Sequence, residues 1–333
     1  MSCGCSILAF IDRLALAGSR TPGACFALLA QQFPKITPLW RPKRSMPKVL
    51  GLCVIGLAIS GCSDGVLAPV GPVADGERLI LLDALGIMLL IAVPTILATL
   101  WFAWWFRASN RAALYRPDWA YSDKLEVLVW AIPALVVLFL GGVAWIGSHQ
   151  LDPARPIDSP VKPLEVQVVS LDWRWLFIYP EKHIATVNRL VIPIGTPVHF
   201  RITSSSVMNV FFVPRIGGEI YAMNGMATQL NLLARNVGRF PGLSAQFSGD
   251  GFSDMGFDTD VVSEKGFHDF VAGVSASPKQ LDEVEYLSLS RQSRSHEVKL
   301  FGRVASGIFD DIVSRRLPPG SGPEPTAQAM LSR

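Results

Sequence analysis

The stretch L-I-L-L-D-A-L-G-I-M-L-L-I-A-V-P-T-I-L-A-T-L-W-F-A-W-W-F, from Leu79 to Phe106, decides the fold of this chain. It is nearly continuous in apolar residues, and Asp83 and Pro94 interrupt it. At about 1.5 Å per residue, a helix of this length crosses a bilayer with some tilt. Pro94 is expected to kink the helix rather than end it, because a membrane helix can satisfy the freed carbonyl locally. The sequence therefore predicts a membrane span here.

A second apolar stretch runs from Leu125 to Gly147 and contains Pro133. The connecting loop, residues 107–124, carries more basic than acidic residues, whereas residues 63–78 are acidic on balance. The positive-inside rule places such a loop in the cytoplasm and both outer flanks in the periplasm. We therefore predict a two-helix transmembrane hairpin over residues 79–147, and a periplasmic location for everything after it.

The residues before the hairpin are typical of a bacterial export signal. Basic residues within 41–48 precede a short apolar core, which ends in the tetrapeptide Ile59-Ser60-Gly61-Cys62. The tetrapeptide resembles a lipobox, in which the cysteine is acylated and becomes the new N-terminus. We expect residues 1–61 to be an N-terminal extension with a signal peptide, without an assigned fold, and residues 62–78 to be a lipid-anchored periplasmic segment. The alternative is a plain signal peptide followed by a buried Cys62.

Composition restricts the chemistry of the remaining chain. The 333 residues carry a net charge of +3, so nothing indicates nucleic-acid binding. Every cysteine lies at or before Cys62, which excludes disulfides and thiolate-held metals from the main body. No two histidines are spaced three to five residues apart, so we expect no metal site from them: they are His149, His183, His199, His268 and His296.

After a proline-rich linker, residues 148–163, the hydrophobic pattern changes to a period of two. Short alternating segments separated by turn residues predict an all-β sandwich over residues 164–263, and the aromatic Trp175 and Phe177 are expected in its core. The alternating segments are residues 164–169, 198–202 and 229–232.

The pattern changes again to a helical one from Glu264 to about Ser290, and a second amphipathic segment runs from Val298 to Val313. We expect a short α-helical C-terminal extension over residues 264–316. The end of the chain, residues 317–333, is rich in Pro, Gly and Ser and is expected to be disordered.

Several motifs follow the lipobox and the two spans in a characteristic order: D-W-R-W-L-F-I-Y-P (172–180), I-A-T-V-N (184–188), S-S-V-M-N-V-F-F-V-P-R-I-G (205–217), I-Y-A-M-N-G-M (220–226) and S-A-Q-F-S-G-D-G-F-S-D-M (244–255). Over Cys62 to about Ser290 the chain resembles subunit II of the bacterial cytochrome o-type ubiquinol oxidases, within the haem-copper oxidase superfamily. The resemblance implies a periplasmic cupredoxin-like Greek-key sandwich with an aromatic-rich C-terminal extension. Residues 292–333 fit it poorly, and their role stays open.

The segment from Ser244 to Met255, called the 244–255 loop below, is by itself a Ser- and Gly-rich loop. In relatives that oxidise cytochrome c, the resemblance places a binuclear copper centre here, with ligands spaced Cys-x3-Cys-x3-His-x2-Met and one upstream histidine. A copper pair held by thiolates cannot form on hydroxyls and a phenyl ring. The lost ligand positions are Asn209, Ser244, Gln246, Ser248, Phe252 and Met255, of which Met255 alone keeps a ligand side chain and Gln246 stands for a carbonyl-donating Glu.

Glu126 lies at the cytoplasmic start of the second span. Ionisable groups beside a span often mark proton paths, and the resemblance matches Glu126 to the subunit II glutamate at the entrance of a proton channel. The alternative is a solvated residue favoured by the helix dipole. Trp173 matches the tryptophan that receives electrons in copper-bearing relatives, and without copper we expect it to be structural.

The resemblance implies a non-catalytic, multi-pass subunit of an inner-membrane, proton-pumping ubiquinol oxidase. It binds no cofactor of its own, and haem and copper belong to its partner, subunit I. Further partners are small membrane subunits, the lipid bilayer and ubiquinol through the complex, but not cytochrome c. One alternative is a free-standing lipid-anchored β-sandwich binding module, although two spans are more than such a module needs. Another is a cytochrome c oxidase subunit that uses copper.

Overall fold

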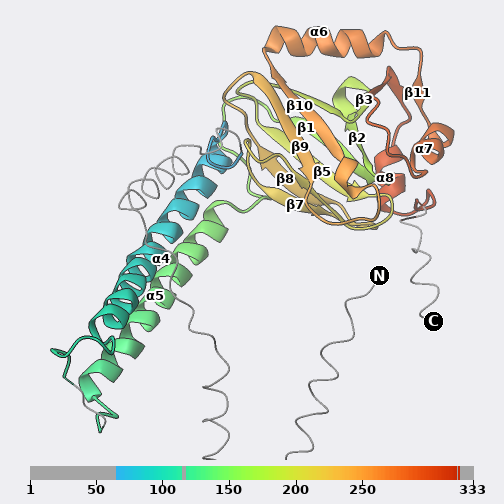
Figure 1. The fold of residues 1–333 in the computed structure, drawn as a ribbon. Coiled ribbons are helices and arrows are strands. Elements are labelled where there is room, and N and C mark those ends of the chain that lie inside the picture. Colours follow the sequence, from blue (N-terminus) through green and yellow to red (C-terminus); the bar gives the residue numbers. More distant parts are fainter. Residues whose placement is uncertain (1–64, 115–117, 321, 323–333) are drawn as a thin grey trace, which may run out of the picture. The chain divides into compact units, whose positions relative to one another are not determined.

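The structure is a computed structural model, and it describes residues 65–114, 118–320 and 322 (Figure 1). By its internal contacts the chain divides into two units, Met1–Gly61 and Cys62–Arg333. All described residues belong to the second unit. The predicted N-terminal extension, signal peptide and acylated Cys62 lie outside the described residues.

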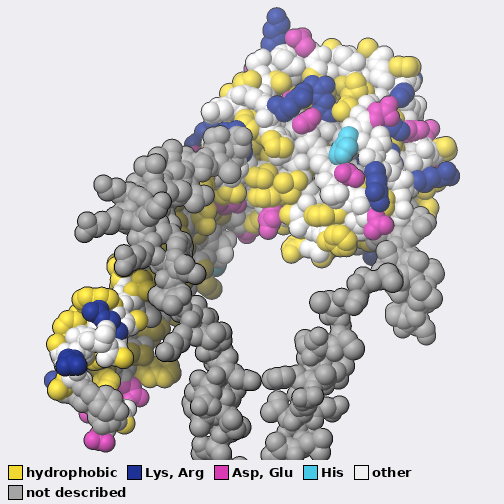
Figure 2. All heavy atoms as spheres, viewed as in Figure 1, with side chains coloured by type: hydrophobic (Ala, Val, Ile, Leu, Met, Phe, Trp, Pro, Cys, Tyr) yellow, Lys and Arg dark blue, Asp and Glu magenta, His cyan; other side chains and the backbone are white. Residues whose placement is uncertain are grey.

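Two long helices, α4 (Pro72–Trp105) and α5 (Asp123–Gln150), form the hairpin and lie side by side (Figure 1). Both are long and apolar enough to cross a membrane, and hydrophobic side chains gather along them in Figure 2. Pro94 lies inside α4 without ending it, as expected, and Pro133 lies inside α5. The helices extend beyond the apolar stretches at both outer ends, to Pro72 and Gln150, and the predicted hairpin over residues 79–147 lies within these limits. Proline in the first turn of α4 favours the earlier start.

The segment before α4 is packed against loops of the β domain. The backbone N–H of Val70 donates to the carbonyl of Arg215 at 2.7 Å, and the N–H of Arg235 donates to the carbonyl of Val70 at 2.8 Å. Gly71 approaches so closely that a Cβ there would lie 2.4 Å from the Leu233 carbonyl oxygen. Asp75 pairs with Arg235 at 3.3 Å. The start of the first helix is therefore fixed to the domain by backbone and side-chain contacts.

The domain is a sandwich of two sheets, which confirms the predicted all-β architecture. One sheet has the order β12-β3-β2-β1-β5-β8, in which β12 is Lys299–Phe301, and the other has the order β4-β10-β9-β6-β7. Strands β1 and β5 pair in parallel, as do β4 and β10, while the other pairs are antiparallel. The bounds are β1 Leu164–Leu171, β2 Arg174–Tyr179, β3 Ile184–Val187, β4 Arg189–Pro193, β5 Val198–Ser204, β6 Asn209–Phe212, β7 Glu219–Ala222, β8 Thr228–Leu232, β9 Gly238–Ser244 and β10 Gly256–Val262.

An aromatic cluster fills the space between the two sheets. Trp175 and Phe177 from β2 are fully buried, as predicted. Trp175 meets Phe211 edge to face at 5.5 Å between ring centroids, and Phe211 stacks on Phe257 at 5.2 Å. Aromatic rings bury large apolar areas, so this cluster contributes strongly to the stability of the sandwich. It also fixes β6 and β10, the two strands on either side of β9, from whose end the 244–255 loop begins.

The C-terminal extension is only partly helical. It contains α6 (Glu264–Ser275), β11 (Gln280–Leu281), α7 (Glu283–Leu289), β12 (Lys299–Phe301), β13 (Arg303–Val304) and α8 (Ile308–Val313). The predicted helix from Val298 to Val313 was wrong in its first half, because β12 pairs with β3 and extends the larger sheet. Apolar residues of the extension pack on the outer face of that sheet and form a second core, which includes Leu171, Leu176, Ile178, Leu289, Phe301, Phe309 and Ile312.

The predicted disorder from residue 317 onward was wrong for the described part of that segment. Leu317 is only 7% exposed, and the N–H of Gly320 donates to the carbonyl of Ser205 at 2.9 Å. The N–H of Gly322 donates to the Asp172 carboxylate at 3.0 Å. Composition could not reveal these partners, because they come from distant parts of the chain.

Candidate functional site

The 244–255 loop joins β9 to β10 and includes a short 3-10 helix, Phe252–Asp254. Its ends are held together by a hydrogen bond from the Ser244 N–H to the Met255 carbonyl at 3.2 Å. Strand β6 pairs with β9, which places Phe211 opposite Ser244. This pairing brings Asn209, the first residue of β6, to the base of the loop. Residues 35 positions apart in sequence therefore meet in one site.

A chain of buried hydrogen bonds occupies the base of the loop. The Asn209 amide, 1% exposed, donates from Nδ2 to Ser170 Oγ at 2.7 Å. Ser244 Oγ donates to Asn209 Oδ1 at 3.0 Å, and it also lies 3.4 Å from the Gln246 carbonyl oxygen. The Gln246 carbonyl thus faces the site, as its position in the resemblance implies. Each polar group here is satisfied by another protein group.

Ser248 and Met255 form the other half of the site, next to Trp173. Ser248 Oγ lies 3.9 Å from Met255 Sδ, and both residues are buried. Trp173 Nε1 donates to the Ser248 carbonyl at 3.0 Å. A Cβ at Gly251 would lie 2.2 Å from the Trp173 ring, so glycine is required for this close approach. Trp173 itself has a φ of 67°, an unusual backbone state that these contacts hold in place.

The Phe252 ring packs beside that of Phe247, which is 72% exposed, at 5.7 Å between ring centroids. The Phe252 backbone carbonyl accepts a hydrogen bond from the Met255 N–H at 3.1 Å. The structure brings Asn209, Ser244, Ser248 and Met255 together. Sequence reasoning missed Ser170, which is one of three polar residues of β1, with Glu165 and Gln167, so nothing local distinguished it.

The residues of the site do not fit a binuclear copper centre. Such a centre needs soft thiolate and imidazole donors. The site offers two hydroxyls, one amide, one carbonyl and one thioether, and the amide and the Ser244 hydroxyl already bond to each other. Within residues 65–114, 118–320 and 322, no group of three or more His, Cys, Asp or Glu could hold a metal ion.

Glu126 lies in the first turn of α5, and its side chain is exposed. The Tyr121 hydroxyl, which the sequence did not single out, interacts with the carboxylates of Glu126 and Asp123. These interactions raise the pKa of Tyr121, because they favour the protonated hydroxyl, which can donate to a carboxylate. The helix start thus gathers two carboxylates and one phenol.

Comparison with known proteins defines the class. Residues 165–262 match the family model "Cytochrome C oxidase subunit II, periplasmic domain", and residues 276–320 match "COX Aromatic Rich Motif". The fold and the 244–255 loop are thus those of a subunit II protein with a periplasmic cupredoxin-like domain and two membrane-spanning helices. The second match reaches into residues 292–320, which the resemblance seen in the sequence did not cover.

Two relatives indicate to which branch of the subunit II proteins this chain is similar. The chain is 47% identical over 275 residues to "Cytochrome bo(3) ubiquinol oxidase subunit 2" of Pseudomonas putida, covering 82% of this chain and 88% of the relative. It is 48% identical over 268 residues to "Ubiquinol oxidase subunit 2" of Acetobacter aceti, covering 80% and 87%. A solved periplasmic domain of Bradyrhizobium japonicum cytochrome oxidase subunit II aligns with 34% of this chain at 22% identity and a TM-score of 0.33. The chain belongs to the ubiquinol oxidase subunit 2 family.

Proposed function

We propose that this chain is the structural subunit II of a proton-pumping terminal oxidase in the aerobic respiratory chain. The complex oxidises ubiquinol and reduces oxygen to water, and its haem and copper reside in subunit I. This chain covers the periplasmic side, binds no copper and receives no electrons from cytochrome c. The observation that carries the proposal is the hydrogen-bonded cluster of Asn209, Ser244 and Ser170 at the base of the 244–255 loop.

The chemistry of that cluster supports a loop without a redox role. An electron-transfer site needs a centre that changes its charge reversibly, and hydroxyls, amides and thioethers do not do so at physiological potentials. Trp173 contacts the loop through its ring and Nε1, so it supports the loop conformation. Electrons then enter the complex from ubiquinol within the membrane.

Metal analysis of the full chain, separated from its partners in detergent, tests this proposal. We expect no stoichiometric copper and no near-infrared band. The variant Asn209→His, Ser244→Cys, Ser248→Cys, Phe252→His is expected to gain copper, because it restores the ligand types on the same backbone. Its control is the same chain with the Phe252→His change alone. One copper pair per wild-type chain would overturn the proposal.

We further propose that Glu126 marks a proton entrance on the cytoplasmic side. Its carboxylate is exposed at the edge of the span and shares the Tyr121 hydroxyl with Asp123, an arrangement that can collect protons from water. This role needs a partner subunit that continues the path.

The location proposed for the chain is the bacterial inner membrane, with Cys62 acylated on the periplasmic side. Copurification tests the assembly: a tagged chain is expected to bring haem-bearing subunits with it. If the chain migrates without haem, the alternative of a free-standing binding module holds instead.

A further inference from the structure

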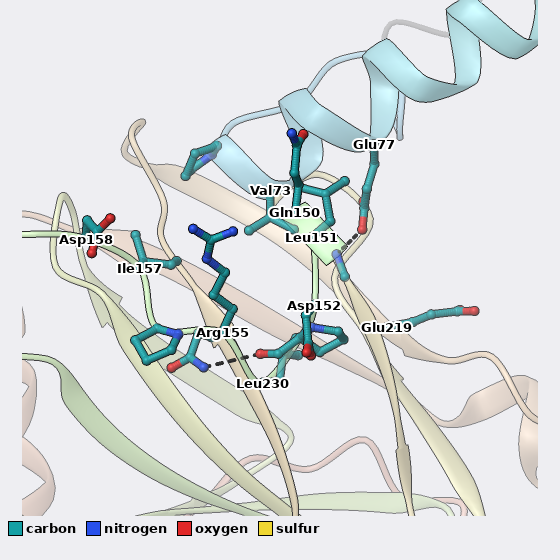
Figure 3. Close-up of a pocket in the computed structure, with 15 residues that line it drawn as sticks. Val73, Glu77, Gln150, Leu151, Asp152, Arg155, Ile157, Asp158, Glu219 and Leu230 are labelled. Carbon is teal, nitrogen blue, oxygen red and sulfur yellow. Dashed lines mark hydrogen bonds between the residues drawn. The ribbon is translucent and has the colours of Figure 1, made fainter. Parts of the chain in front are cut away.

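A hollow of about 450 Å³ lies where the outer ends of α4 and α5 meet the β domain (Figure 3). Its walls come from the first turns of α4, the last turn of α5, the linker after α5, and strands β7 and β8. Apolar parts of the wall include Val73, Leu151, Ile157 and Leu230. Neither the family resemblance nor the proposed oxidase function gives this hollow a role.

The hollow contains both signs of charge. Arg155 rises from the linker toward Val73 in Figure 3, and among the described residues its guanidinium has no hydrogen-bond or ion-pair partner. Glu77 lies across the hollow and accepts a hydrogen bond from the Gly218 N–H at 2.9 Å. The remaining charged residues of the wall are acidic: Asp152, Asp158 and Glu219. A ligand that satisfies both signs therefore needs a phosphate-like anion and a cation.

The position of the hollow along the helices places it at the membrane surface. In α4 the apolar span begins at Leu79, less than one turn after Glu77. In α5, Trp145 lies one turn before His149, and the two rings are tilted by 38° with 4.5 Å between their centroids. Tryptophan concentrates at the level of lipid headgroups. The hollow therefore opens at the depth where phosphates and headgroup amines lie.

We propose that this hollow binds the headgroup of a phosphatidylethanolamine-type phospholipid. Arg155 holds the phosphate by charge-assisted hydrogen bonds. Glu77 and the acidic residues of the linker accept hydrogen bonds from the primary ammonium, and Val73 and Leu151 contact the glycerol region. The acidic residues outnumber the single arginine, so they disfavour phosphatidylglycerol, whose headgroup is anionic. Phosphatidylcholine lacks the N–H donors that carboxylates require.

The bound lipid bridges the hairpin and the domain, because its partners come from both. Glu77 belongs to α4, whereas Arg155 belongs to the linker that enters the sandwich. The Asn231 side chain of β8 already fixes that linker by donating to the Pro153 carbonyl at 3.2 Å and the Ala154 carbonyl at 3.1 Å. The hollow is thus held on a rigid strand, as a selective site requires.

Native mass spectrometry of the full chain, delipidated in detergent and then supplied with one lipid at a time, tests the site. The lipids are phosphatidylethanolamine, phosphatidylcholine and phosphatidylglycerol with identical acyl chains. We expect retention of phosphatidylethanolamine over both others, and an affinity about tenfold lower in Arg155→Ala, since a hydrogen bond to a charged group is lost. Glu77→Gln is expected to reduce the preference over phosphatidylcholine. Arg303→Ala, an exposed arginine on β13, is the matched control.

A conservative variant and a soluble competitor test the same site further. Arg155→Lys keeps the charge and should retain most of the binding, which separates loss of the site from misfolding. Soluble glycerophosphoethanolamine should compete, because the proposal places the headgroup in the hollow. Equal retention of all three lipids, or unchanged binding in Arg155→Ala, would overturn the proposal. Neither result depends on oxidase activity or on copper, so failure of the lipid-site proposal can be distinguished from failure of the proposed oxidase function.

Discussion

Replacing Asn209 with alanine should loosen the 244–255 loop by a measurable amount. The change removes the donor that reaches Ser170 Oγ at 2.7 Å and the acceptor that Ser244 Oγ reaches at 3.0 Å. Ser170 is 0% exposed, so water cannot replace the lost partner. A buried polar group left unsatisfied costs about 1–3 kcal/mol. Ser244 keeps the Gln246 carbonyl at 3.4 Å, so its loss is smaller. We expect the free energy of local opening to fall by about 2–3 kcal/mol.

Hydrogen exchange of the full chain in detergent measures this effect at the loop itself. The informative amides are those of Ser244 and Ala245, which donate to the carbonyls of Met255 and Val210. A decrease of about 2 kcal/mol speeds their exchange roughly thirtyfold when exchange follows local opening. Ser253→Ala, an exposed residue of the same loop, is the control and should change little. Acceleration of less than about threefold in Asn209→Ala would refute the view that this network holds the loop.

Three further predictions concern other parts of the chain. Glu126→Ala should slow oxidase turnover by about tenfold with unchanged haem content, and Glu126→Asp should have a milder effect. Asp118→Ala, at an exposed carboxylate of the loop before α5, is the control. Unchanged turnover in Glu126→Ala would leave only a solvated residue at the start of the helix. Cys62→Ser should abolish the acylated N-terminal peptide in mass spectrometry, and normal processing of this variant would exclude the anchor. Burial raises the pKa of Tyr286 from 10.0 to about 12, so its contribution to stability is intact below pH 10 and is lost as pH rises toward 12. The C-terminal extension should then lose roughly 2 kcal/mol of stability, which faster proteolysis at residues near 290 can detect. The variant Tyr286→Phe should lack this pH dependence. If the variant is as sensitive to alkaline pH as the wild-type chain, the prediction is contradicted.

The membrane hairpin and the sandwich were predictable because their signals are local. A long apolar run and a period of two are properties of neighbouring residues, and the aromatic Trp175 and Phe177 marked the core in the same way. The C-terminal extension was less predictable. Strand β12 exists because Lys299–Phe301 pairs with β3, more than 100 residues away, and no local period reports such a pairing.

The site was predictable in position but not in structure. Ligand spacing located Ser244, Ser248 and Met255, and the structure does gather them with Asn209. Spacing could not reveal that Ser170 completes the hydrogen-bond chain, because that contact follows from how the two sheets face each other. It also could not show that the Phe252 ring packs beside Phe247. Side-chain direction depends on packing that only the assembled fold determines.

The contacts around the 244–255 loop explain how such a loop can keep its shape without a metal. In a metal site, the ion links ligands from both ends of the loop and so fixes the conformation of the backbone between them. Here the same ends are linked by the Ser244 N–H to the Met255 carbonyl, and the middle of the loop is fixed by Trp173 Nε1 bonding to the Ser248 carbonyl. Asn209 ties the loop to the opposite sheet through Ser170. Neutral hydrogen bonds, each contributing about 1 kcal/mol, therefore hold the loop to which the proposed function gives no redox centre.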